Sequence, residues 1–167
     1  MRKLFLILCA ALLLYLGKNA SSADFQRGLD AYYKKDYETA LREWEPLVEA
    51  GIAKAQYYLG IIYEHGQGVP KDLERAVQLY RFAAEQGDVG AQYGLAMAYT
   101  QGSGDGKGVD YVTAHMWANV AASNGSKGGA KLRDWVLNRM SPRDIKEAKS
   151  LLRMCVLNKY KNCLREK

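Results

Sequence analysis

The chain has 167 residues, of which 49% are hydrophobic and 25% are charged, and its formal net charge is +6. This length is sufficient for one domain with a hydrophobic core. Residues 143–167 contribute a net charge of +5 and residues 24–142 only −2, so the chain lacks the broad basic surface expected of a nucleic-acid-binding protein.

The first 23 residues have the composition of a signal peptide. Arg2 and Lys3 precede an apolar run over residues 4–16, and small residues follow at 21–23. The apolar run is shorter than the roughly 20 residues that a transmembrane helix needs. We therefore expect export, cleavage after residue 23 and no stable membrane insertion afterwards. An uncleaved N-terminal membrane anchor is the alternative.

The rest of the chain repeats itself at intervals of 36 and 38 residues. Each repeat contains an aspartate followed by a helical pattern of apolar residues, and these starts are 36–40 (DYETA), 72–76 (DLERA) and 110–114 (DYVTA). An aspartate in this position predicts an N-cap. A glycine follows each pattern, at Gly51, Gly87 and Gly125, and predicts the end of the helix. Pro46 is expected to bend or break the first of these helices, because it cannot donate a hydrogen bond to the Arg42 carbonyl.

A second helix pattern precedes each of these segments, so the chain is expected to form antiparallel helix pairs. The chain closes with a divergent pair near residues 127–139 and 142–157, where Ser141 and Pro142 are good starting residues for the last helix. A single helix pair cannot bury its own apolar face, so stacking of pairs must supply the core. The predicted fold is all-α, an α/α solenoid of about four antiparallel helix pairs.

Two cysteines remain after signal cleavage, Cys155 and Cys163, and an even number in an exported chain suggests a disulfide. A continuous helix would separate their Cα atoms by about 12 Å, which is too far for a disulfide. If they pair, the last helix must therefore end near Asn158. Two free thiols in a reducing compartment are the alternative.

One stretch resembles a known repeat, the Sel1-like repeat, through the residues Ala55-xxx-Leu59-Gly60-xx-Tyr63-xx-Gly66-x-Gly68-Val69-xx-Asp72-xxx-Ala76-xxx-Tyr80-xx-Ala83-Ala84-xx-Gly87. Residues 88–125 resemble a second copy, with Ala96 where the family prefers glycine, and residues 25–51 are similar to a tetratricopeptide half. The expected domain is 24–167, with units at about 25–51, 52–87 and 88–125 and a capping pair at 126–160.

The resemblance implies a right-handed solenoid that acts as an adaptor or scaffold for protein assembly. Members of the family are often exported in bacteria, so a periplasmic or secreted location is expected. The implied partner is another protein or peptide, bound in the concave groove, and no cofactor is expected.

Alignment with the tetratricopeptide helix pattern places a set of residues on the concave face. From the N-terminus, these candidates are Tyr32, Tyr33, Tyr57, Ile61, Glu64, His65, Tyr93, Met97 and Gln101. Tyrosine and methionine side chains on a groove favour recognition of a peptide. The alternative is that some of them, Ile61 and Met97 above all, pack between repeats.

Motifs of catalysis and metal binding are missing from the sequence. No Cys/His set has metal-ligand spacing, and the glycine-rich segment 102–109 lacks the spacing of a phosphate-binding loop. His115 occupies an apolar-face position, which indicates a packing role. His65 ends a helix and is expected to face water or a bound peptide.

Two other functions remain as alternatives to the adaptor. Cysteine-rich relatives of the Sel1-like family have been linked to β-lactam binding or hydrolysis, so a β-lactamase-like hydrolase is the first. Those relatives carry a cysteine pair in each repeat, whereas this chain has one terminal pair. The second is binding of an anionic polymer or membrane surface by the basic C-terminal segment.

Overall fold

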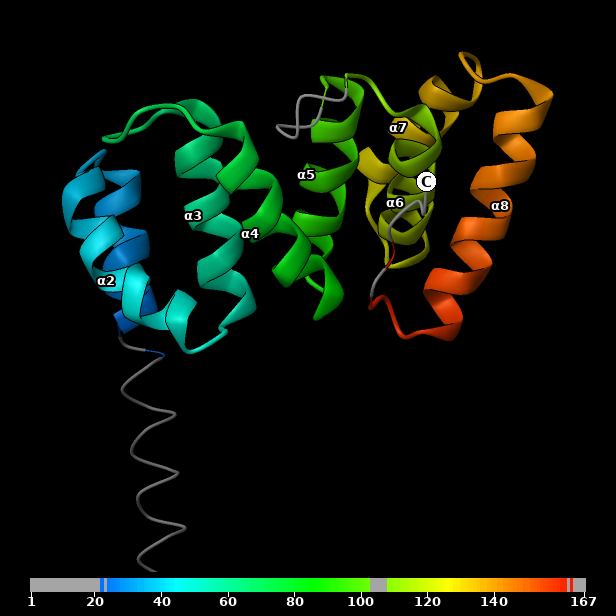
Figure 1. Ribbon diagram of the computed structural model, residues 1–167. Helices are drawn as coiled ribbons and strands as arrows, with labels where there is room; N and C mark the ends of the chain where they lie inside the picture. Colours follow the sequence, from blue (N-terminus) through cyan, green and yellow to red (C-terminus); the bar gives the residue numbers. More distant parts are fainter. Residues whose placement is uncertain (1–21, 23, 103–107, 162, 164–167) are drawn as a thin grey trace, which may run out of the picture.

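The computed structural model describes residues 22, 24–102, 108–161 and 163. Most of the predicted signal peptide and most of the glycine-rich segment therefore lie outside the described residues. The described part contains eight helices and no strand: residues 24–33, α2 (Tyr37–Glu49), α3 (Ala53–His65), α4 (Leu73–Glu85), α5 (Val89–Thr100), α6 (Tyr111–Ser123), α7 (Lys127–Leu137) and α8 (Pro142–Leu157). The predicted all-α solenoid class is confirmed, and Figure 1 shows the helices following one another from the blue first pair to the orange α8.

The repeated aspartates begin α2, α4 and α6, as the sequence predicts. The carboxylate of each accepts a hydrogen bond from a backbone N–H three residues later, at 3.1 Å for Asp36, 2.9 Å for Asp72 and 3.0 Å for Asp110. Each bond satisfies one of the N–H groups that the first turn of a helix leaves unpaired. The same local signal therefore sets the start of three successive helices.

The glycine that follows each of these helices adopts a left-handed conformation. The φ angles of Gly51, Gly87 and Gly125 are 78°, 90° and 94°. After α4, the N–H groups of Gly87 and Asp88 donate to the carbonyls of Ala84 and Ala83, each at 3.0 Å. This is the Schellman arrangement, which needs a residue that tolerates positive φ.

Pro46 does not break α2. The helix continues through it to Glu49, and the Pro46 carbonyl still accepts from the Ala50 N–H at 3.0 Å. Of the expected bend or break, the break was wrong, because the proline stands close to the C-terminal end of the helix. Only one hydrogen bond of the ladder is lost there, and packing of Trp44 and Leu47 holds the turn.

The core is built where an aromatic ring of one helix lies on a glycine of its neighbour. The ring of Trp44 on α2 covers Gly28, and a Cβ built on Gly28 would lie 2.3 Å from Trp44 Nε1. On α4, the ring of Tyr80 lies between Gly60 of α3 and Gly94 of α5, where a Cβ would be 2.6 Å and 3.2 Å from it. Both rings are buried, with 0% and 1% of their surface exposed.

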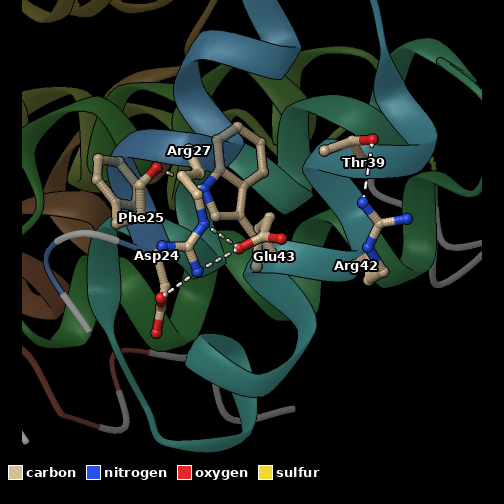
Figure 2. Close-up of polar contacts among 7 residues, drawn as sticks. Asp24, Phe25, Arg27, Thr39, Arg42 and Glu43 are labelled. Atoms are coloured by element: carbon tan, nitrogen blue, oxygen red, sulfur yellow. Dashed lines mark hydrogen bonds and ion pairs between the residues drawn. The ribbon is translucent and has the colours of Figure 1, made fainter. Parts of the chain in front are cut away.

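Polar contacts fix the first pair from its outer side (Figure 2). The Trp44 Nε1–H donates to the Phe25 carbonyl at 3.1 Å. Arg27 bridges the two helices, because its guanidinium pairs with Asp24 and donates to Glu43, with Nε 3.0 Å from Oε2. The first pair is thus held by both a buried ring and a surface ion pair.

The last two helices do not pack as the predicted pair, because α8 lies against α6 rather than α7, but α8 has the predicted start and the chain after it folds back. Ser141 caps α8 and forms a reciprocal capping box with Asp144. The helix ends at Leu157, and the positive φ angles of Lys159 and Tyr160, 53° and 67°, turn the chain back. Cys155 and Cys163 then lie with their Cα atoms 4.8 Å apart and are joined by a disulfide. None of the described helices is long and apolar enough to cross a membrane.

The buried rings generate a stability prediction. Trp44→Ala and Tyr80→Ala should each lower the free energy of unfolding by about 3–5 kcal/mol, because each leaves a cavity at the contact between helices. Urea denaturation measures the change. Phe82→Ala is the control. Because Phe82 is 54% exposed, its removal should lower the free energy of unfolding by less than about 0.5 kcal/mol. Losses below about 1 kcal/mol at both buried positions would contradict this packing.

The C-terminal disulfide generates a second prediction. Its cysteines lie eight positions apart in the sequence, and opening so short a loop should lower stability by about 2–3 kcal/mol on the chain-entropy argument. The measurement compares urea midpoints with and without reductant. The Cys155→Ser/Cys163→Ser variant should be insensitive to reductant. If the urea midpoint of the wild-type protein is the same with and without reductant, the disulfide does not stabilise the fold.

Candidate functional site

The helices that carry the candidate residues are residues 24–33, α3 and α5, the first helices of the first three pairs. Together with α7, which is in direct contact with α5, they form one layer of the solenoid, the first-helix layer. Tyr57 on α3 lies against Gly90 of α5, where a Cβ would be 2.7 Å from its Cζ. Tyr93 on α5 lies against Gly128 of α7, with a corresponding distance of 3.2 Å to Cε2. Each tyrosine thus joins its own repeat to the next.

The nine candidates differ in how much of each side chain a partner could reach. Tyr33, His65 and Gln101 are exposed, and Tyr33 has 70% of its surface accessible. The other six are partly buried: Tyr32, Tyr57, Ile61, Glu64, Tyr93 and Met97. Ile61 and Met97 pack against the main core, so their packing role, left open by the sequence, is present.

Glu64 is engaged within the protein. Its carboxylate accepts a hydrogen bond from the Tyr80 hydroxyl at 2.5 Å, and 17% of its side chain is exposed. Burial and this carboxylate both raise the pKa of Tyr80. Glu64 therefore orients the central ring of the core, in addition to bordering the candidate face.

His65 at the end of α3 is one of the exposed polar residues of this layer. Its Nδ1 lies 3.0 Å from the Ile61 carbonyl oxygen and 3.9 Å from the Glu64 carboxylate. A carbonyl only accepts, so Nδ1 carries the hydrogen of this bond. The imidazole is held to its own helix while 57% of the side chain stays accessible.

The exposed Tyr33 lies at the edge of a cluster of aromatic rings. Its ring centroid is 5.7 Å from that of Tyr32, and Tyr32 is 5.8 Å from Tyr58. Burial, followed by a hydrogen bond with Tyr33, raises the pKa of Tyr58 to about 12. Tyr58 was not among the predicted residues, because helix periodicity places it 100° away from Tyr57, and its contact with Tyr32 of the first pair is visible only in the structure. Four tyrosines from two helices thus form one patch.

His115 has the packing position that the sequence predicts. It lies on α6 with 5% of its surface exposed, and the Asn119 side-chain nitrogen is 3.1 Å from its Nδ1. Burial lowers the pKa of His115, and the positive charges of Arg133 and Lys149 add to the effect. Asp134 opposes it weakly.

No group of three His, Cys, Asp or Glu side chains able to hold a metal ion occurs within the part of the chain that the structure describes.

Comparison with known proteins places the chain among helical repeat proteins. The sequence model of the Sel1 repeat matches residues 53–88 and 89–126, ranges displaced by one residue from the predicted units. No curated protein matches the chain.

Two solved structures have a similar fold. One is c5321, a protective antigen present in uropathogenic Escherichia coli strains and displaying an SLR fold, with a TM-score of 0.78, 24% identity and 91% of this chain covered. The other is a Sel1 repeat protein from Oxalobacter formigenes, with a TM-score of 0.60, 32% identity and 65% of this chain covered. This chain spans 34% and 44% of the lengths of these two proteins.

The buried histidine predicts a dependence of stability on pH. The pKa of His115 is lower in the folded protein than in the unfolded chain, where it is about 6.5, so the unfolded chain takes up the proton first as pH falls. Stability should therefore be complete above about pH 7 and decline as pH falls below about 6.5, by at most about 1.4 kcal/mol per pH unit. Unfolding midpoints across this range measure it. His115→Gln should flatten the decline, and an unchanged slope would contradict the assignment.

Proposed function

Because the chain contains two Sel1 repeats within an all-helical solenoid, we propose that it is an exported adaptor that binds another protein along its first-helix layer. Sel1 repeats generally mediate protein–protein interactions and are typically non-catalytic. The proposed partner segment is an extended or helical peptide, since such a segment can cross several parallel helices of one layer. No catalytic step is assigned to the chain.

The observation that carries the proposal is the tyrosine patch formed by Tyr32, Tyr33, Tyr57 and Tyr58. Tyr33 is exposed, and it is anchored by ring contact with Tyr32 and a hydrogen bond with Tyr58. A fixed aromatic side chain loses little conformational entropy on binding, which is why tyrosine is frequent at interaction hot spots. His65 and Gln101 supply accessible polar groups on the next two helices of the same layer.

Export is the second part of the proposal. It is supported by the basic start, the apolar run and the small residues within 1–23. A disulfide between Cys155 and Cys163 suits an oxidising compartment, because cytosolic thiols are kept reduced. We propose a periplasmic or secreted location on these grounds.

Affinity capture from the bacterial envelope fraction tests the adaptor function. The immobilised protein should retain a partner that Tyr33→Ala/His65→Ala loses by about tenfold or more, since both side chains are exposed on the first-helix layer. Phe82→Ala is the matched control, because it removes an exposed aromatic ring from α4, in the other layer. These sites are better probes than Tyr57 and Tyr93, whose rings also hold adjacent helices together.

Circular dichroism must first give equal helix content for the three proteins. Retention of the partner by the control and its loss from the double variant would support the proposed face. Equal retention by all three would place the site elsewhere, and the absence of any retained protein would count against the adaptor function.

A further inference from the structure

The outer side of α8 carries positive charge without interspersed negative charge. Between residues 143 and 161, every exposed charged side chain that the structure describes is basic, and these are Arg143, Lys146, Lys149, Arg153, Lys159 and Lys161. The two acidic residues of α8, Asp144 and Glu147, are partly buried. Asp144 accepts hydrogen bonds from Ser141, so it belongs to the capping box of the helix.

Helix geometry separates the two sides of α8. At 100° per residue, the basic residues from Arg143 to Arg153 fall within one half of the helix circumference. The opposite half holds the buried Ala148 and Cys155, and it faces α6. The sequence of α8 thus places its acids toward the protein and its bases outward.

Three apolar side chains continue the basic side at its C-terminal end. Met154, Val156 and Leu157 are 54%, 52% and 67% exposed. Their positions fall in the same half of the helix as the basic residues. In Figure 1, α8 lies at the end of the solenoid farthest from the blue first pair, so its outer side is not covered by another described helix.

We propose that this side of α8 docks on the surface of a lipid bilayer containing anionic phospholipids. Basic side chains are attracted by the negative headgroups, and exposed apolar side chains can enter the boundary between headgroups and acyl chains. The combination distinguishes a bilayer from a purely anionic polymer, which offers charge but no apolar layer. A second copy of α8 is disfavoured as the occupant, because two outer sides would bring like charges together.

The orientation that follows keeps the protein-binding face accessible. Docking uses α8, the last helix, whereas Tyr33 and His65 lie on the first helices of the first two pairs. The protein would therefore hold a partner at one end while the other end rests on the membrane. This inference does not depend on the proposed partner face, since the two surfaces share no residue.

Vesicle flotation tests the proposal on the full chain. The protein should float with phosphatidylcholine vesicles that contain phosphatidylglycerol, and binding should fall by about tenfold or more as salt rises from about 0.1 M to about 1 M. Vesicles of phosphatidylcholine alone measure binding that does not depend on anionic lipid, which is subtracted; binding by the basic and apolar segment 1–23 is common to all variants and cancels when they are compared. Absence of a difference between the two kinds of vesicle would overturn the proposal.

Matched variants assign the binding to α8. Lys146→Glu/Arg153→Glu should lower binding by about tenfold or more. The control Lys54→Glu/Lys71→Glu makes an equal change of net charge at exposed sites far from α8 in the sequence, and it should change binding by less than about twofold. Circular dichroism should give equal helix content for both. If Lys146→Glu/Arg153→Glu lowers the helix content, the milder Lys146→Gln/Arg153→Gln replaces it. Equal losses in the α8 and control variants would overturn the assignment.

The apolar residues separate a bilayer from other anionic partners. Met154→Ser/Leu157→Ser should weaken vesicle binding severalfold at constant charge. Unchanged binding would overturn the contribution of apolar contact. Immobilised polyglutamate stands for an acidic protein or polymer, and retention on it without flotation with anionic vesicles would overturn the bilayer as the partner.

Discussion

The contact between an aromatic ring and a glycine determines how closely the helices of this protein approach. Tyr80 can lie between α3 and α5 only because Gly60 and Gly94 present no Cβ toward its ring. Trp44 depends on Gly28 in the same way, and there the indole also donates to a backbone carbonyl. Helix spacing, the order of the pairs and the position of the first-helix layer all depend on these contacts. In the third pair, Ala118 stands at the position of the ring and Ala96 at the position of the glycine, and both are fully buried. Compared with the second pair, the side chain at the ring position is therefore smaller and the one at the glycine position is larger.

Much of the fold could be predicted because its determinants are local. The capping aspartates, the glycines after the helices and the Ser141-Pro142 start act within one turn of chain, so a single sequence reveals them. The helix end near Asn158 followed from the reach of a disulfide. Pro46 was misjudged because its effect depends on tertiary packing around Trp44, which local rules do not contain.

The candidate face was harder to predict, because α3 and α5 are buried on more than one side. Helix periodicity indicates which residues share a side, but it does not say whether that side meets solvent or the next repeat. Tyr57 and Tyr93 share the predicted side with Tyr33, yet their rings cover glycines of the following helix. The sequence offered Glu64 as a residue of the candidate face, whereas its bond to Tyr80 required the structure. Charge on α8 could be counted from sequence, but only its packing on α6 shows that the acids turn inward.

The position of Tyr80 between two glycines has a consequence for how such a chain can evolve. The ring needs two glycines, and only Gly60 lies on the same helix pair, whereas Gly94 lies on α5 of the next pair. At the repeat interval of 36 residues, the position of Gly94 corresponds to Tyr58 on α3. A tandem copy of α3 and α4 would therefore bring a tyrosine to the place where the ring of the preceding copy needs a glycine. Each interface between pairs is thus specific to its two neighbours, and lengthening the array by duplication would require a substitution at that position.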